Sequence, residues 1–116
     1  MFGAGAGWPV ERRRRTAEII VRHMWDEVDP ARDPEGYLLG VATGLDISGR
    51  DAEWWPADLR AAVLAAYPRG GLREEFVACF ESQAARKPGS AAAGAVANGI
   101  ADRMERNVLE RAAGRG

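Results

Sequence analysis

The chain has 116 residues, of which 16 are basic and 17 acidic, and its formal net charge is −1. This length suits one compact domain, and the charge balance gives no reason to expect a nucleic acid or an anionic membrane as partner. Cys79 is the only cysteine, which excludes an intrachain disulfide and makes a reducing cytoplasm the simplest compartment. No apolar run approaches about 18 residues, so the sequence predicts no membrane-spanning helix.

The apolar pattern predicts helices from the start of the chain. Residues 1–7 are rich in glycine and alanine and are expected to be flexible. A first helix is expected from about Pro9 to Asp26, because proline suits a first helical turn and apolar residues recur three and four apart. A loop at 29–34 follows, since each of its aspartates precedes a proline. A second helix is expected from Pro34 to about Asp46, followed by a turn at 48–51.

A third helix is expected from near Pro56 to Ala66. Its spacing predicts that Leu59, Val63 and Leu64 are buried. Trp54 and Trp55 stand directly ahead of it. We expect these rings to cover the end of a helical bundle; a binding surface is the alternative interpretation.

A fourth helix is expected from about Leu72 to Arg86. Phe76, Cys79 and Phe80 fall on one stripe of it, so Cys79 is predicted to pack in the core. Nothing near Cys79 in the sequence offers a general base for a nucleophilic cysteine.

The last helix is expected from Ala91 to about Arg111, with Ser90 as its N-cap. Val96, Ile100 and Met104 recur in steps of four along it. No segment alternates with a period of two, so we predict an all-α fold class with about five helices.

Two polar residues lie among apolar residues of the predicted helices. His23 lies on the apolar face of the first predicted helix, and Asp46 ends the second within an apolar run. Burial of such a group costs roughly 1–3 kcal/mol unless it finds a partner. A histidine in this setting is more often a satisfied core residue, and an aspartate at a helix end often bonds its own turn. A shared functional site is the other interpretation.

Four consecutive arginines occupy residues 12–15. They could mark a phosphate contact. With Glu11 and Glu18 close by, the favoured interpretation is the solvated flank of an amphipathic helix.

Three stretches around these residues carry a resemblance to a known family. They are Ile20–His23, Leu38–Gly49 and Val63–Arg69, the last containing Tyr-Pro-Arg. Their order and spacing are similar to the C-terminal half of HD-domain metal-dependent hydrolases, in the branch close to cyanamide hydratase. The likeness covers residues 8–111 and implies an incomplete HD-domain-like helical bundle between terminal segments at 1–7 and 112–116.

In that family a divalent metal of the zinc or iron class is held by a histidine, an adjacent His-Asp pair and a late aspartate. The resemblance makes Asp46 the late metal ligand and His23 a pocket residue that positions or protonates substrate. The other ligands would lie upstream of Trp8, so this chain would be a truncated or short form that is inactive and binds no metal alone. The implied chemistry is metal-assisted hydrolysis or hydration of a small molecule. The alternative is a non-catalytic helical module that binds protein.

The absence of the family's front helices has an energetic consequence. Ile19, Ile20, Met24 and Leu38 would face water or a partner. At roughly 25 cal/mol per Å² of apolar area, exposing a few such side chains forfeits several kcal/mol. We therefore predict self-association, a partner chain on the face of the first helix, or a marginally folded chain.

Overall fold

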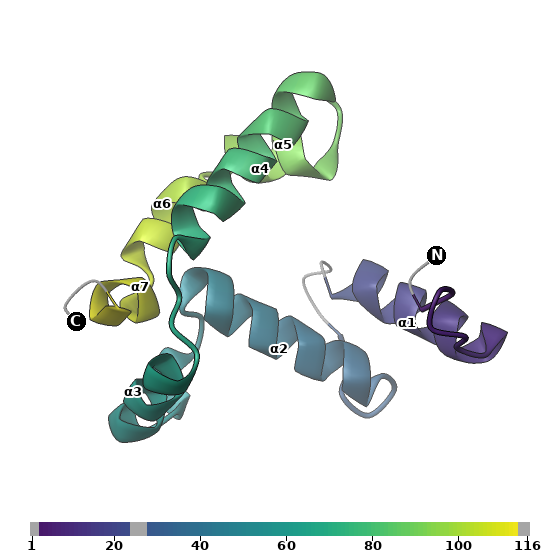
Figure 1. The fold of residues 1–116 in the computed structure, drawn as a ribbon, viewed down its shortest axis with the longest axis horizontal. Helices are drawn as coiled ribbons and strands as arrows, with labels where there is room; N and C mark the ends of the chain where they lie inside the picture. The colour runs from purple at the N-terminus through teal and green to yellow at the C-terminus, as the bar shows by residue number, and fades with distance from the viewer. Residues whose placement is uncertain (1–2, 24–27, 114–116) are drawn as a thin grey trace. The chain divides into compact units, whose positions relative to one another are not determined.

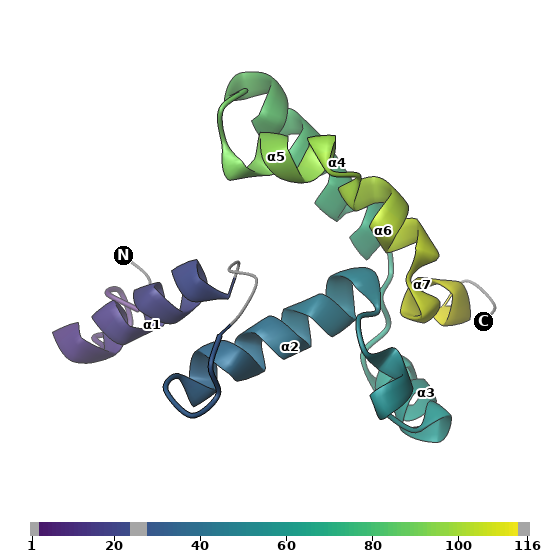
Figure 2. The same ribbon diagram turned by 180° about the vertical axis from the view of Figure 1, so that it is seen from behind.

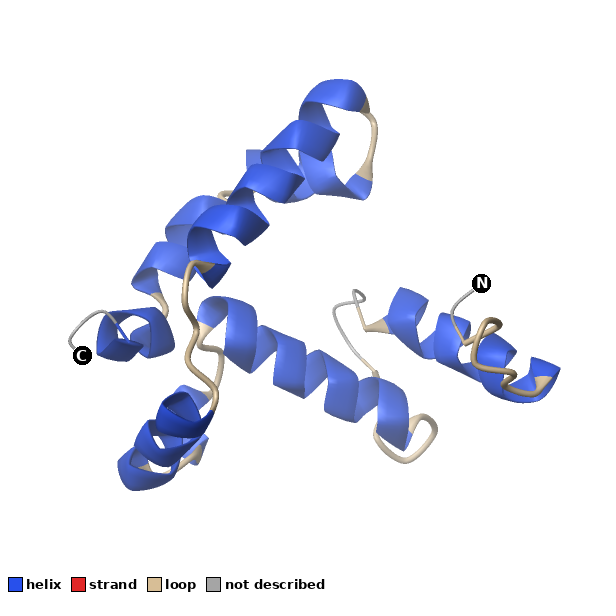
Figure 3. Cartoon of the chain, viewed as in Figure 1, coloured by secondary structure: helices blue, strands red, loops and turns tan. Residues whose placement is uncertain are grey.

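The computed structural model describes residues 3–23 and 28–113. Over these residues the chain forms helices and loops and no strand (Figure 3), which confirms the all-α fold class. None of the described helices combines the length and apolar character that crossing a bilayer requires. The α-helices are α1 (Val10–Arg22), α2 (Pro34–Ser48), α3 (Ala57–Ala66), α4 (Leu72–Arg86), α5 (Ala91–Ala97), α6 (Ile100–Arg106) and α7 (Val108–Ala113), and a 3₁₀ helix, η1, spans Ala52–Trp54.

The chain divides into two compact units, the N-terminal unit Met1–Gly44 and the C-terminal unit Leu45–Gly116. The boundary lies within α2, which is drawn as one helix in Figure 1. It also falls inside the single domain predicted over residues 8–111.

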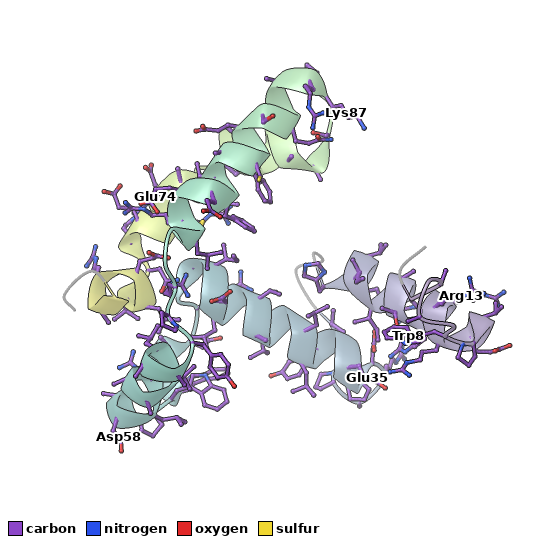
Figure 4. All side chains as sticks on the ribbon, viewed as in Figure 1. Trp8, Arg13, Glu35, Asp58, Glu74 and Lys87 are labelled. Carbon is purple, nitrogen blue, oxygen red and sulfur yellow. The ribbon has the colours of Figure 1, made fainter. Side chains whose placement is uncertain are left out.

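In the N-terminal unit, the segment before α1 forms hydrogen-bonded turns. The amides of Ala6 and Trp8 donate to the carbonyl oxygen of Gly3 at 3.2 and 3.1 Å. A Cβ atom on Gly3 would lie 2.3 Å from the Trp8 ring, and the residue has a φ of +81°, so glycine is required there. Trp8 is labelled in Figure 4.

The first helix is shorter than expected. α1 ends at Arg22, and His23 is its C-cap. The rest of the expected helix, residues 24–26, lies outside the described residues. α1 buries none of its residues. Of the four residues predicted to be uncovered, Ile20 and Leu38 are exposed, at 44 and 64 %, and Ile19 is half-buried. The fourth, Met24, is not among the described residues.

Asp33 fixes the start of α2. Its carboxylate is buried and accepts the N–H of Gly36 at 3.1 Å, the bond of an N-cap, and Pro34 stands at the first helical position. The same carboxylate binds Arg15 and Arg22 of α1. The Gly36 N–H, followed by the two guanidinium groups, holds the pKa of Asp33 below its ordinary value, against the opposing effect of burial.

Two arginines of the run at 12–15, Arg12 and Arg15, make contacts of different kinds. Arg12 stacks over the Trp8 ring, with its guanidinium carbon 4.0 Å from the ring centroid. Arg15 pairs with Glu35 at 2.8 Å, with Asp33, and with Glu18 at 3.1 Å, and these hydrogen bonds raise its pKa. Glu35 is labelled in Figure 4. Arg15 therefore serves the structure of this unit.

The C-terminal unit is built around α4. α5 and α6 pack against α4, and α7 contacts α6 and α3; Figure 1 and the reverse view in Figure 2 both show α5 beside α4. The bounds of α4 match the prediction. The apolar side chains buried in the unit are Ala52, Ile100, Met104 and Leu109.

The expected helix at 91–111 is three helices. Ser90 caps α5 as predicted, accepting the N–H of Ala93 at 3.2 Å. Gly99 then adopts a φ of +76° in the left-handed region, and Asn107 adopts an extended ψ of 124°, so the α-helical hydrogen bonding is interrupted at both residues. The prediction of one continuous helix was wrong.

Three predictions of burial were also wrong. Leu59 and Val63 are 46 and 50 % exposed, because α3 packs on α7 and leaves that face uncovered. Trp54 is exposed and does not cover a bundle end. Cys79 is exposed because it points about 100° around the helix from Phe80.

Candidate functional site

His23 hydrogen-bonds the preceding turn of α1 through its backbone and one ring nitrogen. Its backbone N–H donates to the carbonyl oxygen of Ile19 at 3.0 Å. Its ring Nδ1 hydrogen-bonds the carbonyl oxygen of Ile20, so that nitrogen carries the proton. The imidazole is half-buried at the end of α1. This arrangement corresponds to the interpretation of His23 as a satisfied structural residue.

Asp46 lies in the last turn of α2 and is bonded through both side chain and backbone. Arg69 Nη1 donates to its Oδ1 at 2.6 Å. Its carbonyl oxygen accepts Arg69 Nη2 and Asn107 Nδ2, each at 2.8 Å. The carbonyl groups at a helix end lack partners within the helix. Here the side chains of Arg69 and Asn107 are the hydrogen-bond donors to such a carbonyl. These two bonds fix the position at which α2 ends.

Arg69 is the centre of a three-residue cluster. Its side chain is only 4 % exposed, and its Nε donates to Glu110 Oε1 at 2.8 Å. With Asp46 on the other side, a buried cation has two carboxylate partners. Because a buried charge without partners is strongly unfavourable, this pairing explains why Arg69 is tolerated. We call Asp46, Arg69 and Glu110 the Arg69 cluster.

The described residues do not fit the metal centre that the HD resemblance implies. In ranges 3–23 and 28–113, no group of three or more His, Cys, Asp or Glu side chains is placed to hold a metal ion. The Asp46 carboxylate already faces a guanidinium group, whose positive charge opposes a divalent cation. His23 belongs to the N-terminal unit and Asp46 to the C-terminal unit, so their shared pocket stays a prediction.

An apolar groove lies in the C-terminal unit beside the Arg69 cluster. We call it the α3 groove; its volume is about 540 Å³, within the range of ordinary ligand pockets. Its lining includes Leu59, Val63 and Leu64 of α3, with Trp55 ahead of that helix and Tyr67 and Pro68 after it. Leu45, Leu72 and Leu109 also line it, and its charged lining residues are Asp46, Arg60 and Arg69.

Large side chains of the groove are open to solvent. Trp55, Leu59, Val63 and Tyr67 are all exposed. Contiguous exposed apolar side chains mark interaction surfaces, and tryptophan, tyrosine and arginine are the residue types that carry most binding energy in protein interfaces. The binding-surface alternative for the tryptophans is thus favoured for Trp55.

Arg60 is the polar residue of the groove that the sequence analysis missed. Its Nε is shielded from solvent and has no hydrogen-bond partner among the described residues. The sequence offered no indication of this, since Arg60 stands in an ordinary helical segment between apolar neighbours.

Comparison of the chain with protein-family models, with curated proteins and with solved structures gave no match. Over the described residues, the chain is an all-α protein with an open apolar groove in its C-terminal unit. The resemblance to HD-domain hydrolases stays a prediction from three short stretches of sequence.

Proposed function

We propose that this chain is a non-catalytic helical interaction module, whose α3 groove receives an amphipathic helix from a partner protein. The observation that carries the proposal is the uncovered face of α3, where Leu59 and Val63 line an apolar groove and stay half exposed. A partner helix buries such a face with apolar residues at i, i+3, i+4 and i+7. A peptide helix is favoured over a small molecule because the lining combines tryptophan, tyrosine and arginine.

The expected affinity is modest. Full burial of a large apolar side chain contributes about 1.5–3 kcal/mol, and the groove side chains already have part of their surface covered. Association itself costs several kcal/mol in lost translational and rotational freedom. We therefore expect a transient complex with a Kd in the micromolar range or weaker.

The test uses a synthetic amphipathic helix with a leucine stripe at the i, i+3, i+4, i+7 spacing. It is titrated into the isotope-labelled chain, and amide and indole shifts are followed by NMR. We expect saturable shifts at Trp55, Leu59 and Val63, abolished in a Val63→Asp variant. Ala61→Asp, on an exposed part of α3 outside the groove, is the control that retains them. Shifts confined to residues outside the groove would contradict the proposal.

An HD-type metal-dependent hydrolase is the second proposal. It is supported by the order and spacing of the three stretches that carry the resemblance, and it requires Asp46 to release Arg69 before it can bind a metal ion. Under this proposal Asp46 is a metal ligand, His23 acts on a small-molecule substrate, and another chain provides the missing ligands. The complex of the two chains would then hold stoichiometric zinc or iron, lost in Asp46→Ala and kept in Asp51→Ala. A complex that holds no such metal, and is unable to take it up, overturns this proposal.

A further inference from the structure

The charges that line the α3 groove are unequally compensated. Arg69 has two carboxylate partners, Asp46 at 2.6 Å and Glu110 at 2.8 Å. Arg60 lines the same groove from α3, and its Nε has neither solvent contact nor a hydrogen-bond partner among the described residues. The groove therefore contains one guanidinium group with two carboxylate partners and one with no carboxylate partner among the described residues.

An unpartnered guanidinium in a groove favours one kind of ligand group. A carboxylate can accept two parallel N–H bonds from arginine, a geometry that a single amide or hydroxyl oxygen cannot match. The low dielectric of an apolar groove strengthens such a pair once water is displaced. A lysine brought to the same place would be repelled by the existing charge.

From this imbalance we infer that the helix received by the α3 groove carries an acidic side chain that pairs with Arg60. The inference rests on the proposed function and adds the chemistry of the partner. On α3, Leu59 directly precedes Arg60, and Val63 follows it by three residues. On the partner helix, the acidic residue therefore lies within about one turn of the apolar residues that contact Leu59 and Val63. The partner motif is thus an apolar stripe with a glutamate or aspartate beside it.

The experiment compares three versions of the leucine-stripe peptide, with Glu, Gln or Lys at one position beside the stripe, and moves that position along the helix. Affinities for the whole chain are measured by NMR titration. At the position that faces Arg60, we expect the Glu peptide to bind about tenfold more tightly than the Gln peptide, because it forms a charge-assisted hydrogen bond. The Lys peptide should bind more weakly than the Gln peptide.

Variants of the chain test whether Arg60 causes the preference for the Glu peptide. Arg60→Gln should remove the difference between the Glu and Gln peptides, and Arg60→Lys should retain part of it, because the charge stays and the paired geometry is lost. Arg103→Gln, at an exposed arginine of α6 outside the groove, should leave the preference unchanged. Far-ultraviolet circular dichroism verifies that each variant keeps its helices.

The outcomes separate this inference from the proposed function. If all three peptides bind equally to the groove and Val63→Asp abolishes their binding, the acidic preference is wrong and the groove function stands. If none binds at any position of the charged residue, the groove function itself is wrong. A preference for Glu that persists in Arg60→Gln also overturns the inference, because another residue then recognises the acid.

Discussion

Arg69 donates to Asp46 twice, from Nη1 to the carboxylate Oδ1 at 2.6 Å and from Nη2 to the carbonyl oxygen at 2.8 Å. One guanidinium group thus binds the side chain and the backbone of the same residue. The two ends of this contact differ in environment, since the Arg69 side chain is 4 % exposed and that of Asp46 is 56 % exposed. The residue at the buried end should therefore matter more for stability.

The first prediction concerns this asymmetry. Arg69→Met removes the shared cation and leaves the mostly buried Glu110 carboxylate without its partner, which should lower the free energy of unfolding by about 2–4 kcal/mol. Asp46→Asn leaves Arg69 paired with Glu110 and should cost about 1 kcal/mol or less, as for an exposed ion pair. Urea unfolding measures both, with Arg103→Met as an exposed control. Equal losses for the two variants would show that the exposed end matters as much as the buried end.

Local chemistry was enough to predict several helix ends. α4 begins and ends where predicted because Gly70 and Gly71 precede it and Pro88 and Gly89 follow it. Ser90 caps α5 through a bond to a residue three positions away. In both cases the determinants lie within a few residues of the helix end, which a single sequence displays.

Non-local contacts account for the predictions that were wrong. Asn107 ends α6 while its Nδ2 donates to the carbonyl oxygen of Asp46, a partner far away in the sequence. The exposure of Leu59 and Val63 depends on which helix packs against α3. Periodicity predicts which face of a helix is apolar, but not whether another helix covers that face. The sequence likewise placed Arg69 in a motif but gave no indication that it bonds Asp46 and Glu110.

The second prediction concerns Asn107, whose side chain is fully buried. Its Oδ1 accepts the N–H of Leu109 at 2.9 Å and its Nδ2 donates to Asp46. Asn107→Ala removes both hydrogen bonds at once and leaves the Leu109 N–H without this acceptor, so we expect a loss of about 2–4 kcal/mol in unfolding free energy. Asn98→Ala, at an exposed helix end, should change it by no more than about 0.5 kcal/mol. Similar unfolding midpoints for the two variants in urea would contradict the structural role of Asn107.

The third prediction is a dependence on pH in the N-terminal unit. The pKa of Asp33 is lowered in the folded chain by the Gly36 N–H and by Arg15 and Arg22. The ionised form is thus favoured by folding, so its stabilising effect is present above the ordinary aspartate pKa of about 4 and is lost as pH falls through the lower folded value.

NMR spectra of the labelled chain, recorded as a function of pH, test this expectation. The amide of Gly36 should keep its native shift at neutral pH and lose it in acid. Asp33→Ala, which has no side-chain acceptor for the Gly36 N–H, should show the altered shift already at neutral pH, and Asp102→Ala, in the first turn of α6, should behave like the unchanged chain. A Gly36 shift that stays native below the folded pKa of Asp33 would show that the carboxylate does not hold the start of α2.

The last prediction concerns the uncovered apolar residues of the N-terminal unit, where Val10, Ile20, Val21 and Leu38 are exposed. We expect a second copy of the chain to cover part of this surface, because the exposed side chains gain about 25 cal/mol for each Å² of apolar area that they bury. Sedimentation velocity should give a mass that rises with protein concentration, and Val21→Asp should lower that mass toward the monomer. Ala31→Asp adds the same charge at an exposed loop position and should leave the association intact. A single monomeric species at all concentrations, unfolding cooperatively at high temperature, would mean that the chain is stable with this surface in water.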